Sequence, residues 1–308
     1  MRVILAKEKE KKINLTNNQG TVLGESNIKD IKNKRIDKNL IMSKPDFNIN
    51  AKSAIVVDAK TGKILYAKNS GQQMPIASIT KLMSAKVILD LDPDWRKIIK
   101  YSKVDNDVFK YAKKWEMAYL YVNPGDTMTV KDLFFSALVG SANNAVYALS
   151  RSTGLLRRDF VETMNRKAKE MGMENTHFTE PSGLNPSNVS TAQDLAKLGR
   201  KIFNNFKILE ATTAKKYAFS TINTKKSHII RNRNKLLFSD LYILGTKTGY
   251  LNEAGHCLIV KAKDKKGNEI IVVTLGNFKS GGNYFKETEK LVKWGLERYK
   301  SEMGKRQK

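Results

Sequence analysis

The chain has 308 residues, which is enough for one large domain or two small ones, and 41% of them are hydrophobic, so most of it can fold around a core. Its 56 Lys and Arg residues against 30 Asp and Glu give a formal net charge of +26, which suits nucleic acid, an anionic envelope surface or an anionic wall polymer. The basic residues are spread along the whole chain, and no window combines them with aromatic residues in a nucleic-acid-binding pattern, so we expect solvated surfaces and no nucleic-acid partner.

Residue usage also argues against an intrachain disulfide, a metal site and a membrane-spanning segment. The single cysteine, Cys257, forms no intrachain disulfide and lies in an apolar run typical of a core. The histidines His177, His228 and His256 lack the spacing of metal ligands, and we expect neither a metal nor a cofactor. No apolar run approaches the roughly 20 residues of a membrane span. Residues 1–6 are too short for the apolar region of a signal peptide, so no export signal is visible.

The N-terminal part of the chain divides into a tail and the start of a fold. Residues 1–50 are polar and basic, which predicts a tail or linker, and residues 51–308 are predicted to form one catalytic domain. Within that domain, residues 54–58 and 63–67 have the composition of two strands. The Thr-Gly sequence between them is typical of a hairpin turn.

The middle of the chain is predicted to be mostly helical. A helix begins near Ser78, and a second begins at Thr129, where Asp132 completes a capping box, and ends before Gly140. Further helices are predicted at 144–150, 159–171, 191–203 and 287–299, with Ser190 or Thr191 as the N-cap of the third. Residues 92–126 and 173–188 are expected to be irregular.

Strands return near the C-terminus. Residues 245–249 begin a set of strands, and 257–262 and 269–275 form a second hairpin. The order of a hairpin, many helices, a hairpin and a final helix differs from regular β–α alternation. It predicts an α+β fold, in which an antiparallel sheet made from both chain ends is flanked by helices, with a helical cluster inserted between them.

Ser78 and Lys81 are three residues apart at the start of a predicted helix and therefore lie on one face. A neutral amine beside a serine hydroxyl can remove its proton and create a nucleophile. The alternative is a capped amphipathic helix with an exposed lysine, because Ser-x-x-Lys is a common tetrapeptide. The pair by itself does not decide between them.

Two later motifs favour catalysis. Ser-x-x-Lys at 78–81 is followed by Ser-x-Asn at 141–143 and by Lys-Thr-Gly at 247–249, a set described for penicillin-binding proteins and serine β-lactamases. A second Lys-Thr-Gly at 60–62 precedes the serine and lies in a predicted hairpin turn. We interpret that copy as ordinary turn chemistry.

With these motifs in place, the chain resembles the D-alanyl-D-alanine carboxypeptidases, the low-molecular-mass penicillin-binding proteins, over roughly residues 53–300. Further stretches similar to the family are 58–62, 77–83, 138–145, 164–178, 182–184, 190–195, 232–237 and 247–250. The resemblance implies the β-lactamase/transpeptidase-like fold. It also implies a location outside the cytoplasmic membrane.

The resemblance and the chemistry together imply four catalytic residues. Ser78 attacks a carbonyl and forms an acyl-enzyme, and Lys81 is the general base. A lysine acts as a base only when neutral, and burial next to a second cation, Lys247, lowers its pKa. Ser141 relays a proton to the leaving amine, while Asn143 positions the substrate amide and Lys81. The alternative for Ser141 and Asn143 is a helix cap.

The third motif is expected to bind substrate. Lys247 and Thr248 suit the terminal carboxylate of a D-Ala-D-Ala peptide, and Gly249 allows the substrate backbone to approach closely. The family implies an oxyanion hole made of the backbone N–H groups of Ser78 and Tyr250. The alternative for Lys247 is a solvated lysine on an edge strand.

The predicted function is a serine-type carboxypeptidase that removes the terminal D-alanine of peptidoglycan stem peptides and is inhibited by β-lactams. A DD-endopeptidase using the same site is the first alternative. A serine β-lactamase is less favoured, because Ala142 stands where its class A form has Asp and no deacylating glutamate is evident. A non-catalytic protein that binds the wall through its positive surface is the remaining alternative.

Overall fold

The computed structural model describes residues 44–112, 117–279 and 283–306, with side chains to residue 299. The predicted tail falls mostly on residues 1–43, which lie outside the described residues. The tail and the domain boundary at residue 51 therefore stay predictions.

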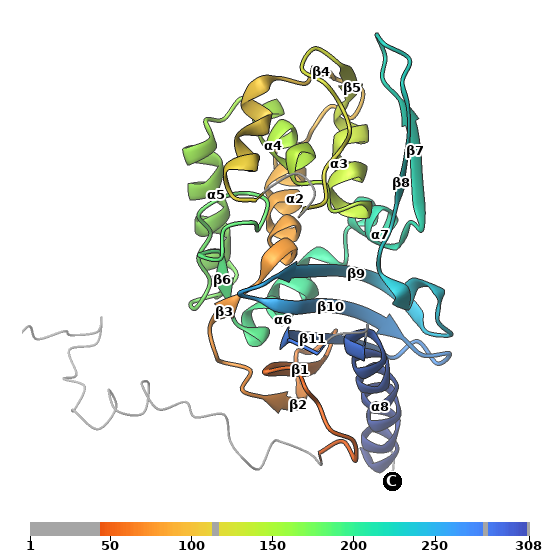
Figure 1. Ribbon diagram of the computed structural model, residues 1–308. Coiled ribbons are helices and arrows are strands. Elements are labelled where there is room, and N and C mark those ends of the chain that lie inside the picture. The colour runs from red at the N-terminus through yellow and green to blue at the C-terminus, as the bar shows by residue number, and fades with distance from the viewer. Residues whose placement is uncertain (1–43, 113–116, 280–282, 307–308) are drawn as a thin grey trace, which may run out of the picture. The chain divides into compact units, whose positions relative to one another are not determined.

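A five-stranded sheet joins the two ends of the chain, as predicted (Figure 1). Its strands are β1 (Ser53–Asp58), β2 (Ile64–Lys68), β9 (Tyr242–Leu251), β10 (Gly255–Lys263) and β11 (Glu269–Asn277). They lie in the order β2-β1-β11-β10-β9, and all neighbours are antiparallel. Strand β9, the last in this order, carries Lys-Thr-Gly and forms one edge of the sheet.

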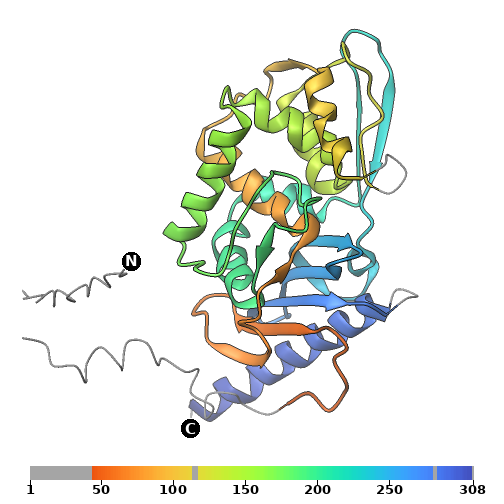
Figure 2. The ribbon, with the colours of Figure 1, turned by 60° about the vertical axis from the view of Figure 1, so that its left-hand side comes forward.

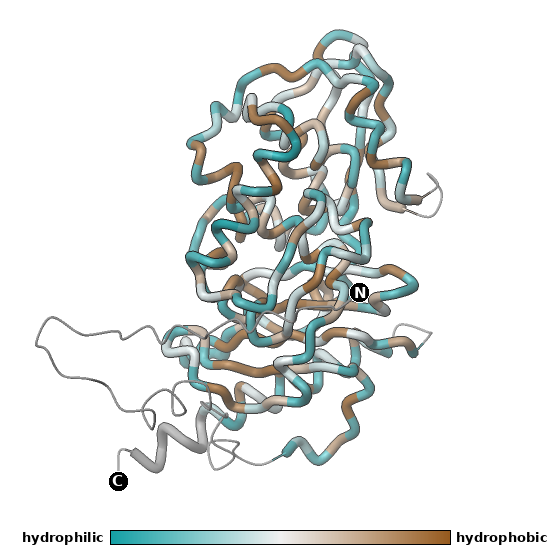
Figure 3. Tube along the Cα trace, turned by 90° about the vertical axis from the view of Figure 1, so that its left-hand side faces the viewer, coloured by the Kyte–Doolittle hydropathy of each residue, from teal (hydrophilic) through white to brown (hydrophobic). Residues whose placement is uncertain are grey.

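Both faces of the sheet are covered, which explains why its inner strands are apolar throughout. All six residues of β1 are buried. Alternate side chains point to opposite faces: Ile55 and Val273 pack in one hydrophobic core, whereas Val56 and Val272 pack in another. Helix α6 (Ala192–Ile202) lies on the first face and α8 (Asn283–Arg306) on the second (Figures 1 and 2). The strands appear as hydrophobic stretches in Figure 3.

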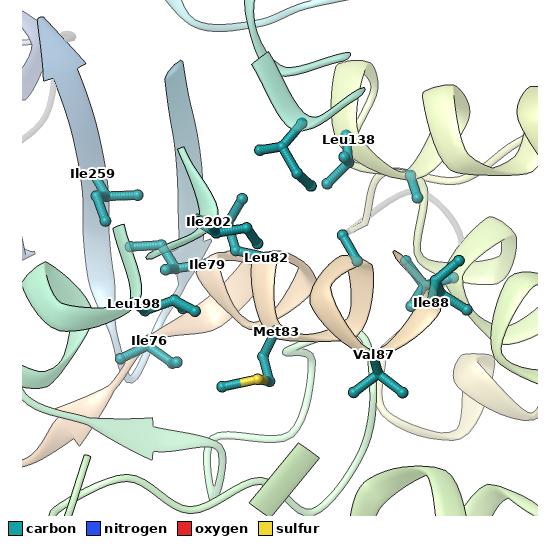
Figure 4. Packing of buried hydrophobic residues seen from close by; sticks show 14 of the residues in the cluster. Ile76, Ile79, Leu82, Met83, Val87, Ile88, Leu138, Leu198, Ile202 and Ile259 are labelled. Carbon is teal, nitrogen blue, oxygen red and sulfur yellow. The ribbon is translucent and has the colours of Figure 1, made fainter. Parts of the chain in front are cut away.

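A helical cluster is inserted between the two sheet segments, again as predicted. It contains α2 (Thr80–Asp90), α3 (Val130–Val139), α4 (Asn143–Ser152), α5 (Arg157–Glu170) and α7 (Phe206–Thr213). Helix α2 runs through its centre, and the side chains of Leu82, Met83, Val87 and Ile88 leave it on different sides to contact the surrounding core (Figure 4). A helix with apolar residues on all sides is a buried helix.

The capping signals read from the sequence are confirmed. Thr129 accepts a hydrogen bond from the Asp132 N–H at 3.1 Å, and the Asp132 carboxylate accepts one from the Thr129 N–H at 2.9 Å. Thr191 caps α6 by accepting from the Asp194 N–H. Cys257 is buried in β10, and burial raises the pKa of its thiol to about 12, as suits a core residue.

Some irregular segments contain short elements that the sequence did not predict. Residues 92–126 include β4 (Ile98–Lys100) and the 3-10 helix η3 (Lys103–Lys110), and β4 pairs with β5 (Thr127–Thr129). Farther along, β7 (Lys216–Ser220) and β8 (Ser227–Arg231) form a separate hairpin. The remaining short elements are β3 (Met74–Pro75), η2 (Ala77–Ile79), β6 (Val189–Ser190) and η5 (Lys235–Phe238). Such elements depend on distant partners, so local periodicity does not reveal them.

Within the described ranges, no helix combines the length and the hydrophobicity needed to cross a membrane.

Candidate active site

Ser78 lies on a tight turn and not within the α-helix where the sequence placed it. The turn is η2, and α2 begins two residues later at Thr80. Ile76 and Ile79 anchor the turn in the core, and Ala77 takes the left-handed backbone conformation with φ of 47°. This conformation is uncommon for a residue with a Cβ. The turn leaves Ser78 partly exposed beside the edge strand β9.

Lys81 is buried, with 1% of its surface exposed, which excludes the alternative of a solvated surface lysine. Its Nζ donates to Ser78 Oγ at 2.7 Å, to Asn143 Oδ1 at 2.6 Å and to the Ser182 carbonyl at 2.5 Å. Burial and then the positive charge of Lys247 hold the pKa of this amine well below its ordinary value. Both effects favour the neutral amine that a general base requires.

Ser141 and Asn143 come from the connection between α3 and α4. Ser141 has φ of 59°, and Asn143 is the first residue of α4. The residue at the N-cap is Ala142, and no side chain caps this helix, so the capping alternative is not supported. Asn143 instead donates from Nδ2 and from its backbone N–H to the Ala118 carbonyl, both at 2.9 Å. It therefore joins Lys81 to the segment around residue 118.

Lys247 lies on an edge strand, but its side chain is only 3% exposed and faces the site. Its Nζ donates to Ser141 Oγ at 2.9 Å and to the Thr248 carbonyl at 3.0 Å. Burial, followed by the charge of Arg233, lowers the pKa of Lys247 to about 7. Lys81 thus contacts Ser78, and Lys247 contacts Ser141.

An open cavity of about 400 Å³ connects these groups. It is lined by Ser78, Met117, Ala118, Tyr121, Ser141, Asn143, Leu184, Arg233, Thr248, Gly249, Tyr250, His256 and Tyr284. All eight predicted site residues therefore meet at one place, since the two that do not line the cavity, Lys81 and Lys247, lie directly behind its serines. A Cβ added to Gly249 would lie 3.0 Å from the Ser78 backbone nitrogen, so this strand and the turn are in close contact.

The second Lys-Thr-Gly lies away from this cavity. Gly62, with φ of 81°, ends the turn between β1 and β2, and the Thr61 N–H donates to Asp58 Oδ1 at 2.6 Å. Lys60 lines a larger cavity of about 670 Å³ at that end of the sheet, which contains no residue of the other motifs. This position fits the interpretation of the second Lys-Thr-Gly as ordinary turn chemistry.

Several residues of the site were not singled out from the sequence. Arg233 and His256 line the cavity, and the His256 ring stacks on Tyr284 at 3.9 Å between centroids. Glu180 lies buried behind Lys81 and raises its pKa, against the larger effects of burial and Lys247. Arg233 belongs to a stretch that resembles the family, whereas Glu180 is one acidic residue in a loop and gives no local signal. No group of three or more His, Cys, Asp or Glu side chains among the described residues could hold a metal ion.

Comparisons with known proteins agree with this geometry. The family model for peptidase S11, D-alanyl-D-alanine carboxypeptidase, matches residues 38–279. The chain is 32% identical to a D-alanyl-D-alanine endopeptidase of Pseudomonas aeruginosa, over 79% of this chain and 76% of the relative. It is 34% identical to the D-alanyl-D-alanine carboxypeptidase DacF of Bacillus subtilis, over 73% of this chain and 57% of the relative.

Solved structures show the same likeness. The Streptomyces K15 DD-transpeptidase superposes with a TM-score of 0.74 at 26% identity, covering 82% of this chain and 99% of that one. A D-alanyl-D-alanine carboxypeptidase from Mycobacterium tuberculosis gives a TM-score of 0.73 at 28% identity, covering 82% and 93%. The predicted α+β transpeptidase-like fold is confirmed. This chain belongs to the D-alanyl-D-alanine carboxypeptidase family, the serine DD-peptidases of the low-molecular-mass penicillin-binding class.

Proposed function

We propose that this chain, a serine DD-peptidase of peptidoglycan, removes the terminal D-alanine of stem peptides through an acyl-enzyme on Ser78. The observation that carries the proposal is the contact between Lys81 Nζ and Ser78 Oγ at 2.7 Å, made by an amine whose pKa burial and a neighbouring cation lower. A nucleophile beside a base that is itself held in place is the arrangement that acyl transfer needs.

In the acylation step, Ser78 Oγ attacks the carbonyl carbon of the penultimate D-alanine, and neutral Lys81 accepts the hydroxyl proton. The tetrahedral oxyanion is stabilised by the backbone N–H groups of Ser78 and Tyr250. Collapse of this intermediate breaks the C–N bond. Ser141, which accepts a hydrogen bond from Lys247, gives its proton to the leaving nitrogen and takes up the proton that Lys81 accepted, so D-alanine departs with its amine restored and Lys81 is neutral again.

Deacylation reverses the roles of the same groups. Water attacks the Ser78 ester, Lys81 accepts a proton from that water, and the Ser78 oxygen regains a proton as the ester bond breaks. Asn143 supports both steps, since its Oδ1 holds Lys81 while its Nδ2 is held by the Ala118 carbonyl. The base therefore keeps one orientation through the cycle.

Substrate recognition is assigned to the edge strand β9. Lys247, in its protonated form, and the Thr248 hydroxyl bind the terminal carboxylate of D-Ala-D-Ala, with Arg233 adding a second positive charge to the cavity. The outer edge of β9 offers backbone groups to an extended peptide. Gly249 leaves no side chain in its path.

The same site suits an endopeptidase, which cuts a cross-link where a carboxypeptidase releases a free amino acid. The relatives in Pseudomonas aeruginosa and Escherichia coli that are named D-alanyl-D-alanine endopeptidases favour this second candidate. Release of D-alanine from a pentapeptide and cleavage of a cross-linked dimer, measured side by side, separate the two activities.

A β-lactamase is less favoured, because none of the described residues that line the cavity carries a carboxylate to activate a deacylating water. Glu180 lies near Lys81, but both its oxygens accept hydrogen bonds from its own loop. We therefore propose that β-lactams acylate Ser78 and are released slowly. Because the family acts on peptidoglycan, the proposed location is outside the cytoplasmic membrane. Contact with an anionic envelope surface remains a prediction from the net charge.

The experiment is mass spectrometry of the protein incubated with benzylpenicillin. We expect one covalent adduct on Ser78 that persists for many minutes, and no adduct on Ser78→Ala or Lys81→Ala. Rapid return of the unmodified protein with hydrolysed penicillin would favour the β-lactamase. No adduct on the wild-type protein would favour the non-catalytic alternative.

A further inference from the structure

The loop formed by residues 180–188 (the Glu180 loop) lies directly against the nucleophile. Gly183, with φ of 87°, is so close to the turn that an added Cβ would lie 2.0 Å from the Ala77 carbonyl oxygen. The Ser182 carbonyl accepts the hydrogen bond from Lys81. This loop therefore contacts the residue before Ser78 and also the base after it.

The loop also holds the first two turns of α2. The Pro181 carbonyl accepts from Ser84 Oγ at 2.6 Å, and Asn188 Nδ2 donates to Thr80 Oγ1 at 3.3 Å. Movement of this loop would change the position of the nucleophile turn, and an error of about 1 Å in a reacting group can reduce a rate by roughly 100-fold.

The Glu180 carboxylate organises this loop from its centre. The side chain is 2% exposed, and Oε2 accepts from the Ser182 N–H at 2.7 Å and from Ser182 Oγ at 2.6 Å. Oε1 accepts from the N–H groups of Gly183 and Leu184 and from Asn188 Nδ2. One carboxylate thus fixes the two residues that contact Ala77 and Lys81.

Glu180 is also a buried negative charge that forms no ion pair with any residue the structure describes. Among the described residues, no basic nitrogen lies within 4.0 Å of it, although an isolated buried carboxylate is costly. The charged groups that face it are Lys81 from α2 and, through the Tyr147 hydroxyl at 3.4 Å, Arg157, which lies 3.8 Å above the Tyr147 ring. Its negative charge raises the pKa of Lys81, in opposition to Lys247.

We propose that Glu180 is a positioning residue: it holds the nucleophile turn and Lys81 in their reactive arrangement, and its buried negative charge acts on Lys81 in opposition to the positive charge of Lys247. The inference rests on the proposed function of Ser78 and Lys81.

The test is the pH dependence of acylation by benzylpenicillin in Glu180→Gln. We expect the limiting rate to fall at least 10-fold, because the loop loses acceptors, and the acidic limb of the rate profile to move to lower pH, because the lost negative charge no longer stabilises protonated Lys81. A purely structural glutamate would lower the rate or the melting temperature and leave the limb in place. An unmoved limb in Glu180→Gln overturns the proposal.

Glu287 provides a matched control. It is also a buried glutamate that accepts backbone hydrogen bonds, from the N–H groups of Asn50 and Ala51, but it lies outside the cavity and the loop. Glu287→Gln should lower the melting temperature without moving the limb. A limb that moves equally in Glu287→Gln would show a general effect of lost charge and would contradict the specific role of Glu180.

Glu180→Asp keeps the charge on a shorter side chain and decides the question if Glu180→Gln does not fold. We expect its limb to lie at lower pH than that of the wild type, with a smaller displacement than full removal of the charge gives, and an unmoved limb would overturn the proposal. The wild-type arm separates this inference from the proposed function. If the wild type is not acylated, the proposed function of Ser78 is wrong. If the wild type is acylated but the acidic limb does not move in the Glu180 variants, only the proposed role of Glu180 is wrong.

Discussion

The positive charge of Lys247 lowers the pKa of the buried Lys81 amine, although the two residues are 166 positions apart (247 − 81) and donate to different serines. One amine has to be neutral to accept a proton, and the other has to be charged to bind a carboxylate. Burial lowers the pKa of both, so catalysis depends on the proton being lost from Lys81 before it is lost from Lys247.

This relationship predicts a bell-shaped dependence of kcat/KM on pH with a D-Ala-D-Ala peptide. The rate rises as Lys81 loses its proton and falls as Lys247, with a pKa of about 7, loses its own. Lys247→Met removes the repelling charge, so the pKa of Lys81 should rise, the acidic limb should move to higher pH, and KM should increase. Lys247→Arg, which keeps a charge, is the control and should leave the acidic limb closer to that of the wild type. An acidic limb that Lys247→Met does not move contradicts the coupling.

The contact between Gly183 and the nucleophile turn predicts a large effect of Gly183→Ala. A Cβ there meets the Ala77 carbonyl oxygen at 2.0 Å, in addition to the cost of a left-handed conformation, which is about 1–2 kcal/mol. Gly154 is a matched control, because it has φ of 82° but no atom of the described residues lies within 4 Å of its added Cβ. Gly154→Ala should lose only the stability that the left-handed backbone conformation costs, and it should still be acylated. Gly183→Ala should lose more stability and at least 10-fold in acylation rate.

Thermal melting of both variants and their acylation rates test this prediction. Equal losses in the two variants would mean that the loop tolerates the added methyl group and that its contact with Ala77 does not position Ser78.

The proton relay predicts that Ser141→Ala lowers kcat by about 10²–10⁴, the usual contribution of a positioned proton donor or acceptor. KM should change little, since Lys247 and Thr248 remain. The measurement is the steady-state rate of D-alanine release with the melting temperature as a check on folding. A kcat within twofold of the wild type would remove Ser141 from the mechanism.

The cap at the start of α3 predicts a stability effect that is separate from catalysis. Thr129→Ala removes the acceptor for the Asp132 N–H and should reduce the free energy of unfolding by about 1 kcal/mol. Thr163→Ala is the control, since that hydroxyl donates to the Asp159 carbonyl within a helix and caps nothing. Its effect should stay within about 0.5 kcal/mol. Chemical denaturation measures both, and a Thr129→Ala that is no less stable than Thr163→Ala would contradict the assigned cap.

Local patterns predicted the larger elements and the fold class. Runs of buried residues in β1 and β11 and the capping signals at Thr129 and Thr191 are properties of neighbouring residues, so the sequence displays them directly. The antiparallel pairing of the two chain ends followed from the order of these elements. The β7–β8 hairpin was missed, because its stability comes from distant contacts such as the stacking of Tyr217 on Phe135.

The site was predictable to a similar degree. The three motifs located Ser78, Ser141 and Lys247, and the structure brings them together. The left-handed Ala77 that turns Ser78 toward the cavity could not be read from the sequence, because it depends on Gly183, 106 residues away (183 − 77). Glu180 was missed for the same reason, since its importance comes from groups that only the folded chain places around it.

The central claim is that Ser78, activated by Lys81, releases D-alanine from a D-Ala-D-Ala peptide. The most direct measurement is D-alanine release from diacetyl-Lys-D-Ala-D-Ala by the wild-type protein and by Ser78→Ala, with equal melting temperatures confirming that both are folded. We predict steady release by the wild type and none above background by Ser78→Ala. Equal release by the two proteins would contradict the account.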